Sequence, residues 1–536
     1  MTWPVPLVPR GDGPHFLRIA RAIADDVRRG RLVAGQRLPG SRTLAAELGV
    51  HRNTVLAALA ELEAQGWLVT EAARGTFVAA ALPEPARTRP PRSRARAGFP
   101  LPPAIVAPEP ARPPTGRGVL WLSSGVPDPR QFPVDALARA WRRVIRRDGR
   151  RLLTYGPPEG HPALREALAA MLRAVRGMTC TADEVLVTRG SQMALDLCAR
   201  ALLRPGDRVA VEALGYRPAW DALRLAGAEL VPVPVDGDGL DVAHLAALAD
   251  RRPIRAVYLT SHHQYPTTVL LAAARRMALA DLARRHRLLV LEDDYDHEFH
   301  YDGRPVPPLA AVDDDGHVVY LGTLSKILAP GLRLGFVVAP ADAIPRLAAL
   351  RMAMDRQGDR PMEAAVAELI DDGELERHVR RMRTLYRARR DALVDALTAR
   401  LPGVVTVDPP RGGISLWARA TPDVDVARWV AACAARGVHV APGARYTFDG
   451  SEPGALRLVF APLTPSELDR AVATMAAALP EARTTTRRAR ASGLSGAAGQ
   501  GAAWGREAPA SRPSASSASL PTPCTSRSRV ATSTRR

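Results

Sequence analysis

Apolar residues in the first 80 positions recur first at helical spacing and then at alternating spacing. Ile19, Ala20, Ile23 and Val27, for example, share one face of a helix, and Gly49 separates two further helical runs. The pattern predicts three helices over 16–28, 41–48 and 52–65, with Ser41 as the cap of the second helix. It also predicts a hairpin with strands over 67–70 and 75–79. The expected core residues are Leu44, Leu48, Val55, Leu59 and Leu62.

From about residue 119 to residue 480, short apolar runs alternate with amphipathic helical runs such as 193–203 and 272–286. The apolar runs expected to be buried strands are 184–188, 208–212, 230–234, 256–260, 288–292, 318–321 and 335–339. Strands that alternate with helices predict an α/β domain with a mostly parallel sheet flanked by helices. The part from about 370 onward begins with a long arginine-rich helix and predicts a smaller C-terminal α+β subdomain.

Two segments lack this patterning. Residues 81–118 contain 11 prolines and clustered arginines, which favours a semi-rigid linker. Residues 483–536 consist mainly of Ala, Ser, Thr, Pro, Gly and Arg, which is typical of a disordered basic tail. Such a tail either binds polyanions loosely or is an extension without function, and the second is the simpler interpretation. The expected domains are therefore 1–80, 81–118, 119–482 and 483–536.

The formal net charge of +19 is unevenly distributed: residues 1–80 carry +3, 81–120 carry +5 and 483–536 carry +9. The remaining residues carry only +2, so the distribution is compatible with DNA binding at one end. The four cysteines show neither close pairing nor metal spacing, so we expect reduced thiols and no metal site. We find no run of 18 apolar residues and no signal peptide, and therefore expect a cytoplasmic protein without membrane contact.

The chain has one lysine, Lys326, whereas the other 73 of its 74 basic residues are arginine. Arginine replaces lysine on most solvated surfaces, but its guanidinium group stays protonated and cannot attack a carbonyl. A lysine that persists against this bias indicates a Schiff base, and pyridoxal phosphate is the expected carbonyl partner. The alternative is that one surface lysine survived by chance.

Residues 37–68, RLPGSRTLAAELGVHRNTVLAALAELEAQGWL, resemble the DNA-binding domain of GntR-family regulators. The resemblance covers nearly all of residues 15–80 and implies a winged helix-turn-helix whose second helix enters the major groove. His51 stands where this family often has Ser or Thr. The alternative is a three-helix protein-interaction module. The implied DNA contacts are Arg52 on guanine, Arg42 and Thr54 on phosphates, and Ser41, Asn53 and the wing-tip Gly75 beside them.

A second resemblance, to fold-type I aminotransferases, covers about 360 residues, and its motifs follow the family's order. Ser191 and Gln192 match a helix start that binds the cofactor phosphate. In LVLEDDYDHEF, from residue 289, Asp293 matches the aspartate that pairs with the pyridine nitrogen, and Asp294 is the alternative if the register is shifted by one. Tyr295 would then bond the ring hydroxyl oxygen.

The segment GTLSKILAPGLRLG places Lys326 in the expected lysine motif. The chain departs from the family in the loop 212–216 and at Thr268, where the family prefers glycine. The resemblance further implies phosphate contacts from Thr323, Ser325 and Arg333, and a contact of Tyr155 with the phosphate in the neighbouring subunit. Tyr216 would stack on the ring, and Arg457 would bind a substrate carboxylate. His263 and Gln264 would lie near the ring hydroxyl, where classical members have asparagine.

A GntR-type domain, a linker and an aminotransferase-like domain, in that order, resemble the MocR subfamily of bacterial regulators. The combination implies a homodimeric transcription regulator that binds double-stranded operator DNA and senses pyridoxal phosphate, or its adduct with an amino acid or amine. A second hypothesis is an active aminotransferase with an accessory DNA-binding module. A third, an architectural DNA-binding protein with an inactive cofactor fold, is disfavoured by the retained lysine.

Overall fold

The computed structural model describes residues 13–83, 100 and 118–483. The chain divides into two compact units, Met1–Ala107 and Pro108–Arg536, which are described separately below. The expected linker over 81–118 and the expected tail over 483–536 lie almost entirely outside the described residues. No helix in the described parts of the chain is long and apolar enough to cross a membrane.

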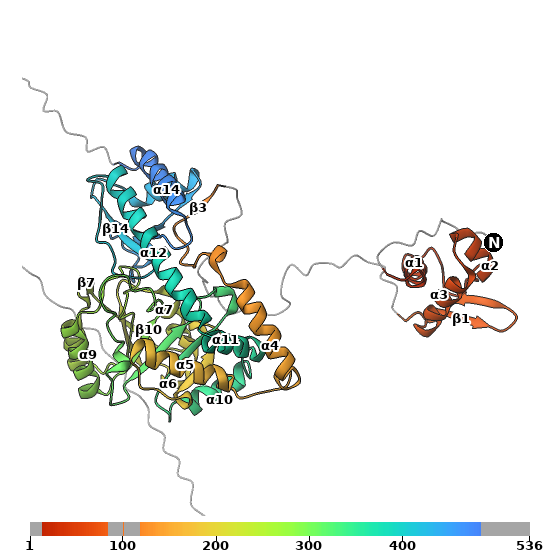
Figure 1. Ribbon diagram of the computed structural model, residues 1–536, viewed down its shortest axis with the longest axis horizontal. Coiled ribbons are helices and arrows are strands. Elements are labelled where there is room, and N and C mark those ends of the chain that lie inside the picture. The colour runs from red at the N-terminus through yellow and green to blue at the C-terminus, as the bar shows by residue number, and fades with distance from the viewer. Residues whose placement is uncertain (1–12, 84–99, 101–117, 484–536) are drawn as a thin grey trace, which may run out of the picture. The chain divides into compact units, whose positions relative to one another are not determined.

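The first unit contains α1 (His15–Arg28), α2 (Ser41–Leu48) and α3 (Arg52–Ala64), drawn in red in Figure 1. Their apolar faces meet in one core that includes Ile19, Ile23, Leu44 and Leu62, as the helical spacing predicts. The expected cap was wrong, because Gly40 is the cap of α2 and Ser41 is its first helical residue. Gly49 ends α2 with a left-handed φ of 62°, which allows the tight turn.

A two-stranded wing completes this unit. β1 (Leu68–Glu71) pairs with β2 (Gly75–Val78) in antiparallel register, with Leu68 opposite Val78. Gly75 has a φ of 120°, and a Cβ atom there would lie 2.8 Å from Nε of Arg37. Glycine is therefore required at this position, both for the backbone conformation and for the close approach of the Arg37 side chain.

The second unit is built on a seven-stranded sheet with the order β4-β12-β11-β10-β9-β5-β6. β12 alone is antiparallel to its neighbours, so the expected mostly parallel sheet is confirmed. Every expected strand is present, shifted by two residues at most. The strands are β4 (Val185–Thr188), β5 (Arg208–Glu212), β6 (Glu229–Val233), β9 (Ala256–Leu259), β10 (Leu289–Asp294), β11 (Val318–Thr323) and β12 (Gly335–Val338).

Helices bury both faces of this sheet, which explains why its strands read as continuous apolar runs. In β5, Val209 and Val211 belong to the core beneath α6, α7 and α10, while Ala210 belongs to the core beneath α8 and α9. The helices in this part of the unit are α4 (Val134–Leu152), α5 (Pro162–Arg176), α6 (Ser191–Leu202), α7 (Arg217–Leu225), α8 (Val242–Arg251), α9 (Ala273–His286), α10 (Ile344–Met354) and α11 (Arg360–Asp371). A small hairpin is formed by β7 (Val235–Asp236) and β8 (Gly239–Leu240).

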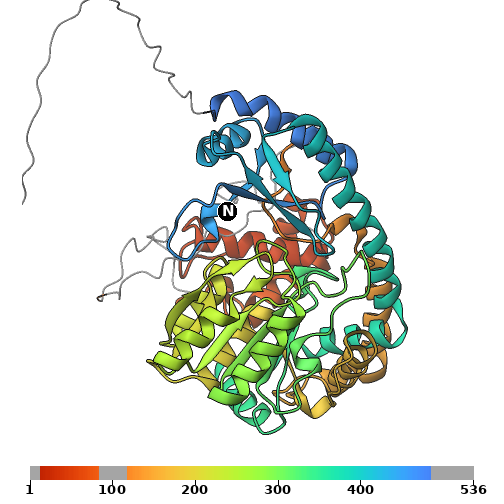
Figure 2. The ribbon, with the colours of Figure 1, turned by 90° about the vertical axis from the view of Figure 1, so that its left-hand side faces the viewer.

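The C-terminal part forms the expected smaller α+β subdomain. Its antiparallel sheet has the order β13-β14-β17-β16, and a short parallel pair joins β15 to β3, near the start of the unit. Figure 2 shows the long α12 running along the edge of the unit, from this subdomain toward the helices beside the central sheet. The elements are β3 (Leu120–Trp121), α12 (Glu374–Arg400), β13 (Val405–Val407), β14 (Ser415–Ala420), α13 (Val426–Ala435), β15 (Val438–His439), β16 (Ala441–Pro442), β17 (Ala455–Val459) and α14 (Pro465–Ala478).

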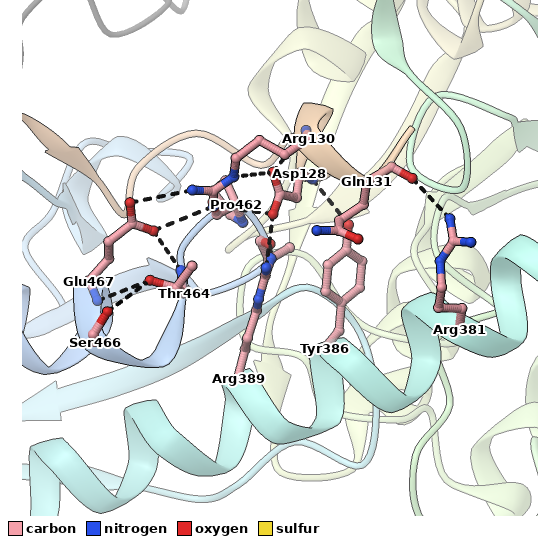
Figure 3. A network of polar contacts seen from close by, with 11 residues as sticks. Asp128, Arg130, Gln131, Arg381, Tyr386, Arg389, Pro462, Thr464, Ser466 and Glu467 are labelled. Carbon is pink, nitrogen blue, oxygen red and sulfur yellow. Dashed lines mark hydrogen bonds and ion pairs between the residues drawn. The ribbon is translucent and has the colours of Figure 1, made fainter. Parts of the chain in front are cut away.

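A buried polar network anchors the segment that follows β3 (Figure 3). The Asp128 carboxylate accepts hydrogen bonds from Arg389 of α12 and from Arg130, each at 2.8 Å. The backbone N–H of Asp128 donates to the hydroxyl of Tyr386, and Arg130 donates to the carbonyl of Pro462, just before α14. The network therefore ties this segment to α12 and to the chain directly before α14.

Candidate functional site

A cavity of about 650 Å³ opens where the C-terminal ends of the central strands face the smaller subdomain. Ten of the residues singled out by sequence line it, although they are spread over 267 positions of the chain. They are Ser191, Gln192, Tyr216, Asp293, Tyr295, Thr323, Ser325, Lys326, Arg333 and Arg457. The structure therefore brings together side chains that the motifs could only order along the chain.

Lys326 follows the end of β11, and its Nζ atom donates a hydrogen bond to the backbone carbonyl of Gly125, at 2.7 Å. Burial, followed by the nearby Arg457 guanidinium, lowers the pKa of Lys326 to about 8. A substantial fraction of this amine is therefore unprotonated near neutral pH, which is the form that attacks a carbonyl.

Asp293 is the second-last residue of β10 and lines the cavity. Its Oδ2 atom accepts a hydrogen bond from the Tyr258 hydroxyl at 2.8 Å, while its buried Oδ1 atom has no partner. Burial raises the pKa of Asp293 to about 7. The alternative residue, Asp294, belongs to another cluster, where its carboxylate accepts from the Tyr320 hydroxyl and pairs with His297. Of these two aspartates, only Asp293 presents a free acceptor at the cavity.

Anion-binding groups gather at the opposite end of the cavity. Ser191 begins α6, whose N-terminal backbone N–H groups lie beside the cavity. Gly190, with a φ of 79°, has no side chain, and a Cβ atom there would lie 3.2 Å from the Arg333 guanidinium. Thr323 and Ser325 line the same cavity, and the Ser325 backbone N–H donates to Thr323 Oγ1 at 3.1 Å. This arrangement of donors and one guanidinium suits a phosphate group.

Arg457 comes from β17 of the smaller subdomain and is 2% exposed. Its guanidinium carbon lies 4.6 Å from the centre of the Tyr265 ring, and its Nε atom has no hydrogen-bond partner. A buried guanidinium group with unused donors, facing a cavity, can bind a carboxylate through two parallel hydrogen bonds.

Several lining residues were missed by the sequence analysis. Tyr265, Arg445 and Tyr446 line the cavity, as does Trp121, whose ring stacks on His439 at 4.2 Å. The apolar run at 119–122, followed by Ser-Ser-Gly, carried a local signal of a strand and turn. Arg445 and Tyr446 have no local signal, because they enter the site through the packing of the smaller subdomain, whereas Tyr265 directly follows Gln264, in the loop after β9.

Three singled-out residues lie away from the cavity lining. His263 pairs with Asp296 at 2.7 Å, and Gln264 donates to the carbonyl of Leu214 at 2.6 Å. Tyr155 is 73% exposed, with the Arg356 guanidinium 4.0 Å from its ring centre. Tyr295 lines the cavity, but its hydroxyl donates to the backbone carbonyl of His263, at 2.9 Å. The proposed ring-hydroxyl contacts of His263, Gln264 and Tyr295 remain predictions.

In the first unit, the singled-out DNA contacts lie at the start of α3 (Arg52, Asn53 and Thr54), at the start of α2 (Ser41 and Arg42) and at the start of β2 in the wing (Gly75). Arg42, Arg52 and Asn53 are exposed, Thr54 is half-buried, and Arg52 donates to Ser41 Oγ at 3.2 Å. His51 has a role that the sequence analysis missed, because its Nδ1 atom accepts from the Asn53 backbone N–H and caps α3. The signal was available, since a residue directly before a helical run is a candidate cap.

Comparisons with known proteins agree with both units. Residues 16–78 match the bacterial regulatory proteins of the gntR family, and residues 117–475 match aminotransferase class I and II. The chain is 34% identical over 466 residues to the probable rhizopine catabolism regulatory protein MocR of Rhizobium meliloti, covering 85% of this chain and 92% of that protein. It is also 34% identical over 493 residues to the HTH-type transcriptional regulator TauR of Rhodobacter capsulatus, covering 88% and 98%.

Among solved structures, the second unit resembles LysN, an alpha-aminoadipate aminotransferase from Thermus thermophilus. The TM-score is 0.63 at 30% sequence identity, over 68% of this chain and 92% of that one. The fold and the site thus define a GntR-type DNA-binding domain joined to a fold-type I aminotransferase domain. The chain belongs to the MocR-type regulators of the GntR family, which are transcription regulators with an aminotransferase-like domain.

Proposed function

We propose that this regulator binds pyridoxal phosphate in the cavity around Lys326 and responds to the cofactor, or to its adduct with an amino acid or amine. The observation that carries the proposal is the placement of the only lysine. Its amine faces a cavity that also holds a free acceptor on Asp293, a phosphate-binding end at Arg333 and a carboxylate-binding Arg457. LysN, which has the same fold, was solved in complex with N-(5'-phosphopyridoxyl)-L-leucine.

Pyridoxal phosphate, when bound, supplies a reactive carbonyl and an electron-withdrawing ring. Lys326 would provide the amine, made available by its lowered pKa. Asp293 would hold a proton at the pyridine nitrogen through its partnerless Oδ1 atom, while Tyr258 keeps the other carboxylate oxygen in place. Burial raises the pKa of Asp293, and a cationic partner would draw it back toward the ionised form.

The remaining lining groups would orient the cofactor and the effector. Ser191, Thr323, Ser325 and Arg333 would hold the phosphate, and Tyr216 would pack against the ring. Arg457 would bind the effector's carboxylate, which favours α-amino acids over simple amines. A ligand that binds two arrangements of the protein with unequal affinity shifts their populations, and this is how occupancy would change DNA binding.

The DNA-binding role rests on the first unit, where Arg52 and Asn53 are exposed at the start of α3. Arginine pairs with guanine through two hydrogen bonds in the major groove. Binding to chromosomal DNA is consistent with the expected cytoplasmic location of a bacterial regulator. We also propose a homodimer, because Tyr155 is exposed in the single chain and is available to a second copy.

The test is a gel shift of the full chain with the DNA directly upstream of its own gene, without and with pyridoxal phosphate. We expect specific binding whose affinity changes with the cofactor, and loss of the cofactor effect in Lys326→Ala. Arg52→Ala should weaken DNA binding by about 10- to 100-fold, from the 1–3 kcal/mol of a paired base contact. Arg29→Ala, an exposed arginine outside α3 and the wing, is the charge-matched control. Specific binding that is unchanged by pyridoxal phosphate and by amino acids would contradict the proposal.

A second candidate function is catalytic transamination, favoured by the retention of Lys326, Asp293 and Arg457 in one cavity. Sustained release of a keto acid from amino-acid substrates would support it. Turnover that stops after about one equivalent per chain would support sensing instead.

A further inference from the structure

Three buried histidines form a cluster outside the lining of the cavity. His262 and His263 follow β9, and His300 follows β10. One ring nitrogen of each lies within 4.8 Å of the others, and the side chains are 1%, 1% and 6% exposed. The residues share no sequence motif, so their meeting is a product of the fold. It stands against the expectation that the chain has no metal site.

The cluster contains ring nitrogens without hydrogen-bond partners. Neither nitrogen of His262 has one, and Nε2 of His263 has none. Buried polar atoms without partners destabilise a fold, so native structures normally satisfy them with protein, water or a bound ion.

The surroundings of His263 match those of a metal ligand. Its Nδ1 atom lies 2.7 Å from the Asp296 carboxylate, so Nδ1 carries the proton and Nε2 presents its lone pair to the cluster. A carboxylate that orients a histidine in this way is the usual outer support of a histidine-bound metal. The backbone of Gly412 packs closely against this nitrogen, since a Cβ atom at position 412 would collide with Nε2 of His263 and with the backbone carbonyl of Phe299.

We propose that His262, His263 and His300 bind one divalent transition-metal ion of the zinc class, as a structural brace. Three imidazole nitrogens suit Zn²⁺, Ni²⁺ or Cu²⁺. Nitrogens about 3.4 Å apart would satisfy tetrahedral bonds of about 2.1 Å, so the rings need to turn inward from the present spacing. The ion would join the ends of β9 and β10, and the bridge between His300 and Gly412 extends this brace to the smaller subdomain.

The metal site would also be connected to the cavity, through the backbone of His263. The Tyr295 hydroxyl, which lines the cavity, donates to the backbone carbonyl of His263. Metal binding that holds His263 in place would therefore help to hold Tyr295. This link does not depend on the identity of the effector or on DNA binding.

The test uses the full chain without a histidine tag, refolded or expressed with zinc, dialysed into chelator-washed buffer and analysed for metal by mass spectrometry. We expect about one zinc per chain and a higher melting temperature with zinc than after chelation. His300→Gln should lower the zinc content at least tenfold under the same dialysis. His244→Gln, which alters an exposed histidine on α8, is the matched control and should retain the metal.

Substitution with Co²⁺ provides a second readout. Tetrahedral Co²⁺ bound by three imidazole nitrogens and one further ligand gives strong visible absorption, whereas adventitious surface binding does not, and His300→Gln should abolish the band. Absence of retained zinc in the wild-type chain would overturn the proposal, whatever the variants do. Equal retention by wild type and a folded His300→Gln variant would also overturn it, and far-ultraviolet circular dichroism reports whether that variant is folded.

Discussion

At the residue scale, the cavity holds a carboxylic acid, Asp293, and an amine, Lys326, whose pKa values are both shifted toward neutral pH. Burial raises the pKa of Asp293 to about 7 and lowers the pKa of Lys326 to about 8. Both shifts have the same cause, because an environment poor in water disfavours the charged form of either group. A site with such groups can exchange protons near neutral pH, which suits chemistry at a carbonyl.

The lone lysine permits a direct measurement of its pKa. Amine acetylation can label only Lys326 and the N-terminus, and peptide mass spectrometry distinguishes the two. In the apo form, the labelling rate of Lys326 should rise with pH to a midpoint near 8. Arg457→Gln should raise this midpoint by about one unit, because it removes a positive charge that disfavours the ammonium form.

Arg445→Gln is the control for that experiment, since Arg445 also lines the cavity but is not among the groups that shift Lys326. Its midpoint should equal that of the wild type. A wild-type midpoint close to 10.5, the ordinary value for lysine, would contradict the environment described for Lys326.

Asp293→Asn should have opposite effects on stability and on cofactor affinity. The folded-state pKa of Asp293 is raised, so in the apo protein its contribution to stability is complete below pH 4 and is lost as pH rises through about 7. The side chain of the asparagine variant does not ionise, so the variant does not lose this stability as pH rises. Its apo melting temperature, relative to wild type, should therefore be higher at pH 8 than at pH 5.

The same variant should bind pyridoxal phosphate about 10- to 100-fold more weakly, as expected for loss of a hydrogen bond between charged groups of about 1.5–3 kcal/mol. Absorbance titration measures the affinity. Asp314→Asn, on the exposed surface, is the control and should change neither property. A pH-independent difference in melting temperature would show that burial of the Asp293 charge is not the cause.

At the scale of elements, the site depends on strand ends and on the segment after β3. β10 and β11 end at Asp294 and Thr323, which delivers Asp293 and Lys326 to one edge of the sheet. The segment after β3 supplies the Gly125 carbonyl that receives the hydrogen bond from Lys326. The Asp128 network holds this segment against α12 and α14, three residues beyond Gly125.

Asp128→Asn should destabilise the protein by about 3–5 kcal/mol, because it leaves the Arg389 guanidinium buried without its carboxylate. Burial raises the pKa of Asp128, but hydrogen bonds from Arg130 and Arg389 outweigh it and lower the pKa below its ordinary value. The contribution is therefore present above pH 4 and is lost as pH falls further. Urea unfolding at pH 7 and at pH 3.5 measures both effects.

Asp469→Asn is the matched control, since it removes an exposed ion pair with Arg400. It should destabilise the protein much less than Asp128→Asn, because an ion pair in water contributes little to stability. Equal destabilisation by the two variants would mean that the Asp128 network does not hold the segment after β3.

At the scale of the whole molecule, the expected homodimer determines whether a single chain contains a complete site. Tyr155 is 73% exposed, outside the cavity of its own chain. If it binds the phosphate of a second copy, Tyr155→Phe should weaken pyridoxal phosphate binding about tenfold, with little change in unfolding free energy. Absorbance titration and urea unfolding separate the two quantities.

Mixed dimers make this prediction decisive. A dimer of one Tyr155→Phe chain and one Lys326→Ala chain combines an intact Lys326 with the partner's intact Tyr155. It should contain one site of wild-type affinity, which neither variant has alone. Failure of mixing to restore that site would place the function of Tyr155 within its own chain, and light scattering reports whether dimers form at all.

Local patterns predicted much of this molecule. The strands from β4 to β12 in the central sheet and the three helices of the first unit were visible in the sequence, because periodicity depends on neighbouring residues, whereas the cavity residues near Lys326 were implied by the resemblance to aminotransferases. Ser41 was wrongly expected to cap α2, because the pattern does not distinguish a cap from the first helical residue. Arg445 and Tyr446 were missed, because their place in the cavity depends on how the smaller subdomain packs, and Tyr265 was missed although it directly follows Gln264.

The sequence by itself determined the class of protein, the order of its domains and the lysine that carries the proposed chemistry. A single lysine among 74 basic residues is a property of composition, and periodic apolar runs reflect burial. Only the tertiary structure decided that Asp293, and not Asp294, presents a free carboxylate oxygen at the cavity, and that three histidines from two loops meet. The physical reason is that hydrogen bonding and desolvation depend on distances in space, which separation along the chain does not specify.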